Sequence, residues 1–211
     1  MALEPQVQTT HIHATAYRYS SYDTPLWSRP NSEGGRWHNP GDDPTQYLAL
    51  STDGAWAELI RHEELKSEQE VALVHIQMWA IQIDQALVVD YSTFERAEAA
   101  SFDPEALVSD NYTRCRQEGT RLRAKGYHGV VAPNAALPGE RNLTLFGPRV
   151  ASSWDQPPLL KSSMPTVVVA VGTPPVGLLE RVRRYGDQHS ELILFRRQQA
   201  ARRLDSPESA G

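Results

Sequence analysis

The chain has 211 residues, of which 40% are hydrophobic and 22% charged, as is ordinary for a globular protein with one domain and a small appendage. Its net charge is −5, and Glu180, Asp187 and Glu191 interrupt the arginines near the C-terminus, which argues against direct nucleic-acid binding. A single cysteine, Cys115, excludes an internal disulfide framework and a thiolate zinc site. With no long apolar segment and no apolar N-terminal core, the sequence predicts a cytoplasmic protein that binds no membrane.

Short strands are expected in the first half of the chain, where residues alternate in polarity or form brief apolar runs. Asp53 is expected to cap a helix that runs to about residue 65, and Ser92 with Glu95 forms a capping-box pattern that begins another helix. The expected strands are 14–20, 46–51, 71–83 and 87–91.

Residues 21–44 contain four prolines and three glycines, so we expect a long loop there and no regular element. A loop of this length in a compact domain often carries function. Gly34 and Gly35 directly precede Arg36 and Trp37, and glycine permits close approach of the backbone to a ligand.

The second half continues with helix between about residues 103 and 125, ending before Gly126. Two short strands then flank a turn-rich loop at 133–139. A proline- and serine-rich linker leads to a further strand–helix–strand unit, and the residues after about 203 are expected to be disordered. This mixture of elements, without regular βαβ alternation, predicts an α+β fold. The ranges are 128–132 and 142–146 for the two strands, 148–165 for the linker, and 166–171, 176–185 and 192–195 for the last unit.

Glu58 is the carboxylate with the most unusual surroundings, since Ala57, Leu59 and other apolar residues flank it. Burying a carboxylate costs free energy unless it is paired, so such a position can mark a functional group. The alternative is that Glu58 lies on the solvent side of the helix with Arg61 and His62. The spacing of His11 and His13 would put both rings on one face of a strand, but no third ligand accompanies them, so no metal site is expected.

Six short runs resemble, in order and spacing, the RES domain family over about residues 14–150. They are YRY (17–19), EGGRWH (33–38), YLA (47–49), AE (57–58), GYHGVVAPNA (126–135) and NLTLF (142–146). The resemblance implies a fold similar to ADP-ribosyltransferases, with NAD held between two small mixed or antiparallel sheets flanked by helices. It also implies an enzyme, typically a toxin of a toxin–antitoxin system, that cleaves the nicotinamide–ribose bond of NAD by hydrolysis or phosphorolysis.

The resemblance assigns roles to particular residues. The family arginine corresponds to Arg36, its glutamate to Glu58 and an active-site tyrosine to Tyr47. Where the family has a serine, this chain has Asn134, whose amide keeps a donor and an acceptor and is expected to touch the nicotinamide side. The remaining NAD-binding candidates are Arg18, Tyr19, Trp37 and Asn142.

The chain is expected to divide into four parts. An N-terminal arm (1–13) precedes the catalytic domain (14–150), an extension (151–203) and a disordered tail (204–211). No cofactor is expected beyond NAD as the substrate. The partners implied are NAD, phosphate as one candidate acceptor, a cognate antitoxin and a second copy of the chain.

Two alternatives use the same site. One is transfer of ADP-ribose to a macromolecule. The other is a module that binds a nucleotide or a partner without turnover, which the asparagine at the serine position and the C-terminal extension motivate.

Overall fold

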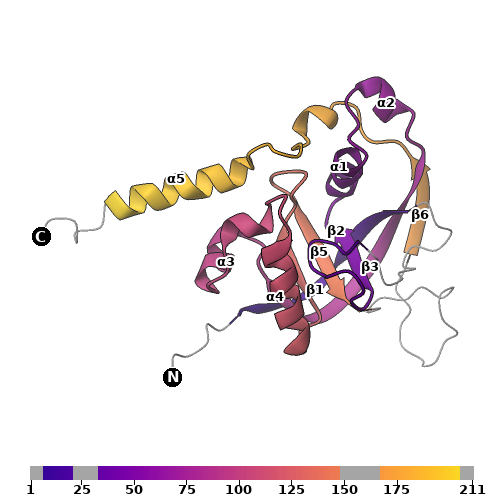
Figure 1. Cartoon of the computed structure of the whole chain (residues 1–211). Helices are drawn as coiled ribbons and strands as arrows, with labels where there is room; N and C mark the ends of the chain where they lie inside the picture. Colours follow the sequence, from indigo (N-terminus) through magenta and orange to yellow (C-terminus); the bar gives the residue numbers. More distant parts are fainter. Residues whose placement is uncertain (1–6, 21–32, 148–166, 205–211) are drawn as a thin grey trace, which may run out of the picture.

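In the computed structural model, residues 7–20, 33–147 and 167–204 are described (Figure 1). The strands form one connected sheet with the order β1-β2-β5-β4-β3-β6, and a further pairing between β1 and β3 closes five of them on themselves. An α+β fold is therefore confirmed, but we had expected two small sheets where the described strands form one. The strands are β1 (Thr9–Ser20), β2 (Thr45–Ala49), β3 (Ile76–Asp90), β4 (Gly129–Pro133), β5 (Arg141–Phe146) and β6 (Val167–Gly172).

The long strand β3 makes closure possible. It pairs with β1 along its whole length on one edge, and on the other edge it pairs first with β6 and then with β4. Apolar side chains from all five strands of the ring gather in one cluster, which includes Trp79, Ile81 and Leu143. Successive residues of a strand point to opposite faces of the sheet, so the strand residues that alternate with this cluster face the helices.

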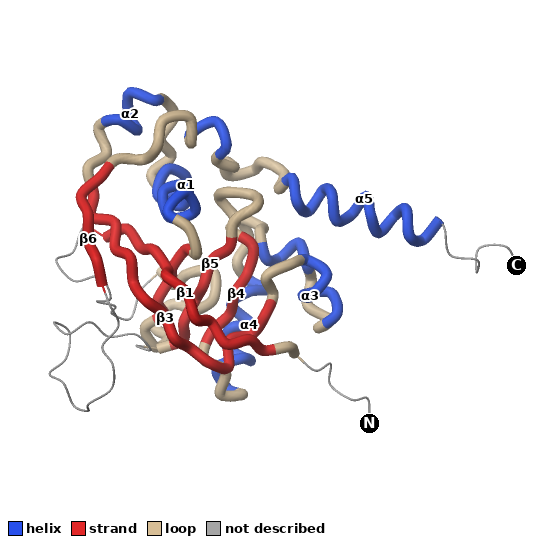
Figure 2. The backbone as a smooth tube through the Cα atoms, turned by 180° about the vertical axis from the view of Figure 1, so that it is seen from behind, coloured by secondary structure: helices blue, strands red, loops and turns tan. Residues whose placement is uncertain are grey.

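The helices are arranged in two groups, with α1 toward the top and α3 and α4 lower in both views of the backbone (Figures 1 and 2). Trp56, Leu59 and Ile60 of α1 belong to a second apolar cluster, whereas Phe94 of α3 and Leu122 of α4 belong to a third. The helices are α1 (Thr52–His62), α2 (Glu68–Ala72), α3 (Phe94–Ala99), α4 (Thr113–Ala124) and α5 (Ser190–Leu204), with 3-10 turns at η1 (Pro104–Leu107) and η2 (Leu179–Arg181).

Several expected boundaries in the first half of the chain differ from the observed ones. The strand expected from residue 14 begins at Thr9, so part of the expected N-terminal arm is paired with β3. The strand expected at 71–83 was wrong at its start, because the side chains of Ser67 and Glu70 form a capping box that begins α2. The N-cap of α1 is Ser51, whose hydroxyl accepts from the Gly54 N–H, and is not Asp53.

The C-terminal unit differs most from expectation. The helix expected at 176–185 is reduced to the single turn η2, and Val182 after it is extended. The strand expected at 192–195 was wrong, because these residues lie in α5, with Leu192 and Phe195 buried and Leu194 exposed. That spacing is helical, and a run of four apolar residues cannot by itself distinguish a strand from a helix. The linker 148–165 and the residues after 204 fall outside the described residues.

None of the helices in the described ranges combines the length and the hydropathy that crossing a bilayer would require.

Candidate functional site

A cavity of about 570 Å³ opens where the end of β1, the loop before β2 and helix α1 meet. That size is typical of pockets for small molecules and cofactors. Among its lining residues are three arginines, two carboxylates and five tyrosines, which are Arg18, Arg36, Arg116, Glu33, Glu58, Tyr17, Tyr19, Tyr47, Tyr112 and Tyr185. Seven of the eight residues expected to form the site therefore line this one cavity, and the exception is Asn134.

Glu58 is held in place from both sides. Its Oε1 accepts a hydrogen bond of 2.7 Å from Asn142 Nδ2 on β5, and its Oε2 lies 3.8 Å from His62 Nε2, one turn further along α1. Its side chain is 19% exposed, so the carboxylate faces the cavity while bulk water screens it little. Burial and the charge of Glu58 raise the pKa of nearby Tyr19. The arrangement presents a fixed negative charge to whatever occupies the cavity.

Arg36 follows the glycine pair and is tied to the segment before α4. Its Nη1 donates to the carbonyl of Ser109 at 2.7 Å, and its guanidinium lies over the ring of Tyr112 at 4.5 Å from the ring centre. Arg116 approaches the same ring at 5.9 Å and donates through Nε to the carbonyl of Gly35 at 2.9 Å. Guanidinium groups fixed in this way suit the bidentate binding of phosphate oxygens.

Tyr47 is locked by the turn that carries Arg36. Its hydroxyl accepts a hydrogen bond from the Trp37 N–H and lies 2.9 Å from His38 Nδ1. Burial raises the pKa of Tyr47, and burial together with the charge of Arg123 lowers the pKa of His38, so both groups are neutral at pH 7. With Nδ1 of His38 as acceptor, the phenol donates to it and keeps its ring at the cavity wall.

Gly35 is required by this close approach. A Cβ at this position would lie 2.5 Å from the Tyr47 hydroxyl and 2.8 Å from His38 Cε1, both far inside van der Waals contact. We expect Gly35→Ala to displace Tyr47 and to lower the free energy of unfolding by about 2 kcal/mol, as overpacking of a well-packed site does. Denaturant unfolding measures this, with Gly172→Ala as the control, since a Cβ there meets only Trp56 at an ordinary 3.7 Å. Equal losses in both variants would contradict the role of this turn.

Trp37 has a structural position. Its indole is 2% exposed and packs against Tyr91 and Phe102 at ring separations of 6.5 and 6.2 Å. Trp37, one of the NAD-binding candidates, lines the cavity, and its side chain also belongs to the apolar core with Tyr91 and Phe102. Arg18 and Tyr19 do line the cavity, at the end of β1.

Asn134 is fully buried behind the cavity wall. Its Nδ2 donates to the Gly54 carbonyl at 3.2 Å and to Asn142 Oδ1 at 2.8 Å, and its Oδ1 accepts from the N–H groups of Ala136 and Leu137. The structure places Asn134 one hydrogen bond behind Asn142, outside the residues that line the cavity. A chain of hydrogen bonds thus leads from Asn134 through Asn142 to Glu58.

Removing the Asn134 amide leaves four polar partners in the protein interior without their bonds. We expect Asn134→Ala to lower the free energy of unfolding by about 3 kcal/mol, since buried unsatisfied groups cost about 1–3 kcal/mol each and partial relaxation offsets some of this. Denaturant unfolding of the two proteins measures the difference. Asn39→Ala is the control, because that amide donates only to Asp42 and Thr120 in a partly exposed loop. A similar loss of unfolding free energy in the control would contradict the structural role of the Asn134 hydrogen bonds.

Four contributors to the cavity were missed by the sequence interpretation: His62, Tyr112, Arg116 and Tyr185. His62 was considered only as part of a solvent-facing helix side. Tyr112 and Arg116 lie about 80 residues from the loop that they contact, and Tyr185 comes from the extension beyond the family resemblance. A single sequence carries no local signal for contacts of this range.

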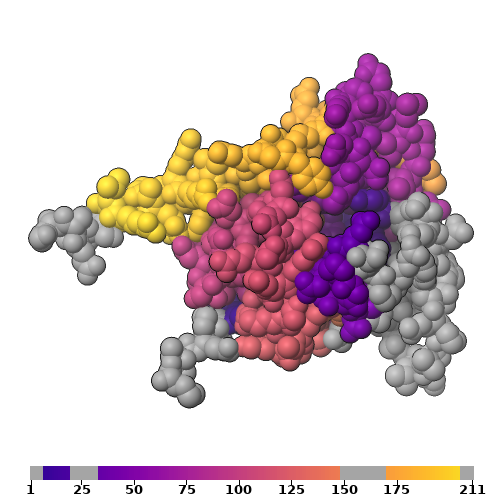
Figure 3. Space-filling model, in the orientation of Figure 1, coloured from indigo at the N-terminus to yellow at the C-terminus, as the bar shows by residue number. Residues whose placement is uncertain are grey.

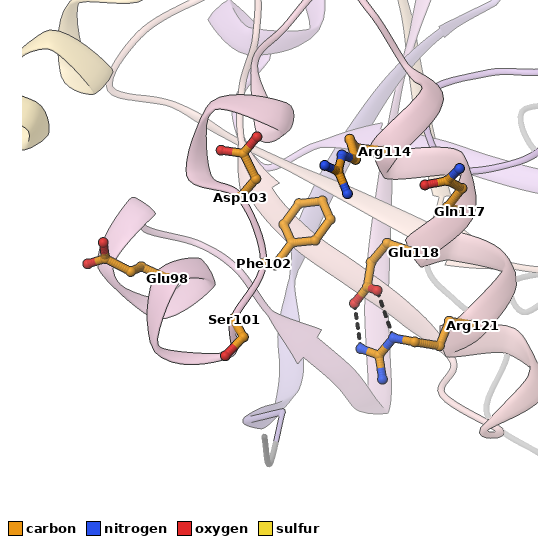
Figure 4. Close-up of a pocket in the computed structure, with 8 residues that line it drawn as sticks. All are labelled: Glu98, Ser101, Phe102, Asp103, Arg114, Gln117, Glu118 and Arg121. Atoms are coloured by element: carbon orange, nitrogen blue, oxygen red, sulfur yellow. Dashed lines mark hydrogen bonds and ion pairs between the residues drawn. The ribbon is translucent and has the colours of Figure 1, made fainter. Parts of the chain in front are cut away.

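A second cavity, of about 560 Å³, lies between α3, the segment 101–103 and α4 and contains none of the expected site residues (Figure 4). Its most buried charge, Glu118, is already bound by Arg121 through hydrogen bonds of 2.6 and 2.7 Å and accepts another from the Tyr91 hydroxyl. The Glu118 carboxylate raises the pKa of Arg121, as expected for a satisfied ion pair. We therefore assign the functional site to the cavity around Glu58.

Curated relatives resemble this chain over part of its length. The probable NAD(+) phosphorylase Rv3189 of Mycobacterium tuberculosis is 28% identical over 147 residues, covering 63% of this chain and 66% of the relative. NAD(+) phosphorylase MbcT of Mycobacterium bovis is 25% identical over 125 residues, covering 57% and 67%. The chain thus spans about two thirds of the length of these curated relatives.

The fold is also that of a solved structure. A chain in the crystal structure of the M. tuberculosis MbcT–MbcA toxin–antitoxin complex superposes with a TM-score of 0.62 at 22% identity, covering 83% of this chain and 91% of that one. Residues 10–162 match the RES domain, a match that includes every site residue expected from the sequence. This protein belongs to the RES domain family.

Proposed function

We propose that this protein cleaves the nicotinamide–ribose bond of NAD. The observation that carries the proposal is the Glu58 carboxylate, which is fixed by Asn142 in the wall of a cavity that also presents three arginines. Cleavage at the anomeric carbon passes through an oxocarbenium-like state, as in glycoside hydrolysis, and a nearby carboxylate stabilises that positive charge. The names of the two relatives support the same reaction.

Each group of the cavity has a task in this reaction. Arg36, Arg116 and Arg18 bind the diphosphate, since they are the cationic groups of the cavity wall. Glu58 lies beside the nicotinamide ribose, and Tyr47, whose pKa burial raises, contacts the ribose hydroxyls as a neutral phenol. Asn142 and Asn134 are positioning residues, because they act on the substrate through Glu58.

The bond changes are simple. The C–N bond between nicotinamide and ribose breaks, and its electron pair returns to the ring nitrogen, which loses its positive charge and leaves as neutral nicotinamide. An oxygen of the acceptor then bonds to the anomeric carbon. We propose inorganic phosphate as the acceptor, because the relatives are named phosphorylases and the arginines suit a second anion.

The acceptor is tested by incubating the protein with NAD, with and without phosphate, and identifying the products by chromatography and mass spectrometry. Phosphorolysis gives a phosphorylated ADP-ribose and stops when phosphate is removed. Free ADP-ribose formed without phosphate would replace phosphate by water, and ADP-ribose attached to a protein would indicate transfer to a macromolecule.

A toxic NAD-degrading enzyme requires restraint in its own cell. The solved complex contains an antitoxin bound to the relative, and we propose a cognate antitoxin for this chain as well. Co-expression with the neighbouring open reading frame should restore growth that the chain alone suppresses. We also propose that the fold is similar to that of ADP-ribosyltransferases, because the site combines Arg36, Tyr47 and Glu58.

Dimerisation stays a prediction, which sedimentation analysis of the purified chain would test.

A further inference from the structure

The segment between β6 and α5 lies outside the part of the chain that matches the family, yet it packs against α1. Leu178 and Val182 are buried in the apolar cluster that contains Trp56 and Ile60 of α1. In the space-filling view this segment, orange to yellow, lies against the purple surface of α1 and α2 before α5 extends away from the body (Figures 1 and 3).

Asp110 fixes this segment to the domain. Its carboxylate binds Arg61 of α1 and also accepts from Arg183 Nη1 at 3.3 Å and from the Gly186 N–H at 2.7 Å. The two guanidinium groups are almost fully buried, with side-chain exposures of 1% and 8%. The backbone N–H of Arg183 also donates to the Ala136 carbonyl at 2.8 Å. The residues around 183–186 are therefore held at defined positions.

Tyr185 lies in the middle of this clamp and reaches the cavity. The buried guanidinium of Arg61 covers one face of its ring, 4.3 Å from the ring centre. Its hydroxyl lies 3.1 Å from His62 Nδ1, and His62 Nε2 in turn lies 3.8 Å from Glu58 Oε2. The hydroxyl also shares a hydrogen bond with that of Tyr112, and burial raises the pKa of Tyr185.

We propose that Tyr185 is a substrate-binding residue of the Glu58 site, and that its ring contacts the nicotinamide group of NAD. This inference rests on the proposed function. The side chain is 41% exposed, so an edge of a ring that Arg61 and His62 hold still is open to a ligand. An aromatic group ordered before binding loses little entropy when the ligand arrives.

The nicotinamide end is chosen because of the position of Glu58. The carboxylate must lie beside the ribose that carries nicotinamide, and a single imidazole separates it from Tyr185. Tyr112 and Tyr185 share a hydrogen bond, and the guanidinium of Arg36 lies over the ring of Tyr112. The diphosphate is therefore expected on the Tyr112 side of this pair. A flat heteroaromatic ring next to that ribose can therefore reach Tyr185, which lines the same cavity.

The test compares NAD with ADP-ribose, which lacks nicotinamide, by calorimetry in a Glu58→Gln background that does not consume the ligand. Adding Tyr185→Ala should raise the Kd of NAD roughly tenfold, as loss of an aromatic contact does, and leave the Kd of ADP-ribose unchanged. Tyr185→Phe keeps the ring and should bind NAD within about twofold of the parent. Val176→Ala, on the same segment and 95% exposed, is the control and should change neither Kd.

The proposal is overturned if Tyr185→Ala weakens both ligands equally or neither. Thermal unfolding of the Tyr185 variants shows whether the segment stays in place, and the ADP-ribose titration separates loss of the ring contact from a loosened segment, which would weaken both ligands. The proposed function fails separately, if the wild-type chain binds NAD in a Tyr185-dependent manner but releases no nicotinamide.

Discussion

Replacing Glu58 by glutamine is expected to lower the rate of NAD cleavage by roughly a thousandfold, because a fixed charge at a water-poor site is worth that much to a charged transition state. The amide keeps the shape of the side chain and can still accept from Asn142 Nδ2, so folding should be unaffected. The variant loses only the negative charge that faces the developing ribosyl cation. Initial rates of nicotinamide release, with equal amounts of folded protein, measure the effect.

The matched control is Glu63→Gln. Glu63 is the C-cap residue of the same helix and is exposed, so removal of its charge should leave the rate within about twofold, as for other screened surface charges. A Glu58→Gln enzyme as active as the wild type would remove this carboxylate from the mechanism. Equal losses in both variants would indicate a general effect of charge on α1.

Asp110→Asn is expected to destabilise the protein by about 3 kcal/mol, because it leaves two buried guanidinium groups without their carboxylate. For a chain of this length that loss corresponds to a fall of about 6 to 12 °C in Tm. Asp53→Asn is the control, since the ion pair of Asp53 with Arg181 is exposed and contributes at most about 1 kcal/mol. Comparable shifts in Tm for both variants would contradict the clamp.

The same carboxylate gives a pH dependence with a definite sign. Burial alone would raise the pKa of Asp110, but the Gly186 N–H, Arg183 and Arg61 outweigh burial and lower it. A lowered folded-state pKa contributes stability that is complete above the unfolded value, about 3.9, and is lost as the pH falls through the folded value. The difference in unfolding free energy between wild type and Asp110→Asn should therefore be constant above pH 5 and shrink below about pH 4.

The elements that the sequence predicted well are those whose patterns are local. The strands at 128–132 and 142–146 match β4 and β5 to within a residue, and the helix expected to end before Gly126 ends at Ala124. Glycine at 126 has a positive φ of 80°, which explains that boundary. Short apolar runs flanked by turns are reliable when the sheet buries them fully, as it does β4.

The C-terminal unit was misread because tertiary contacts override its local preferences. Residues 176–185 carry a helical pattern, but Gly177 has a positive φ of 80° and the Arg183 N–H is used by the Ala136 carbonyl. An extended backbone there places Arg183 on Asp110. Such a choice depends on a carboxylate more than 70 residues away and leaves no trace in the local sequence.

The predictions for the site residues also divide into those with a local sequence pattern and those that depend on tertiary contacts. Arg36 and Glu58 were predicted because their neighbours resemble a known pattern, and both line the cavity. The position of Asn134 could not be predicted, because its bonds to Gly54 and Asn142 depend on how β4 and α1 pack. From the sequence, Trp37 could bind the ligand or pack in the core, and its indole packs against Tyr91 and Phe102.

The most direct test of the account is release of nicotinamide from NAD by the purified full chain in phosphate buffer, followed by chromatography. We expect stoichiometric loss of NAD and appearance of nicotinamide with the wild-type protein, and at least a hundredfold slower release with Glu58→Gln. Folded protein that binds NAD and releases no nicotinamide would contradict it, and would make this cavity a nucleotide-binding site without turnover.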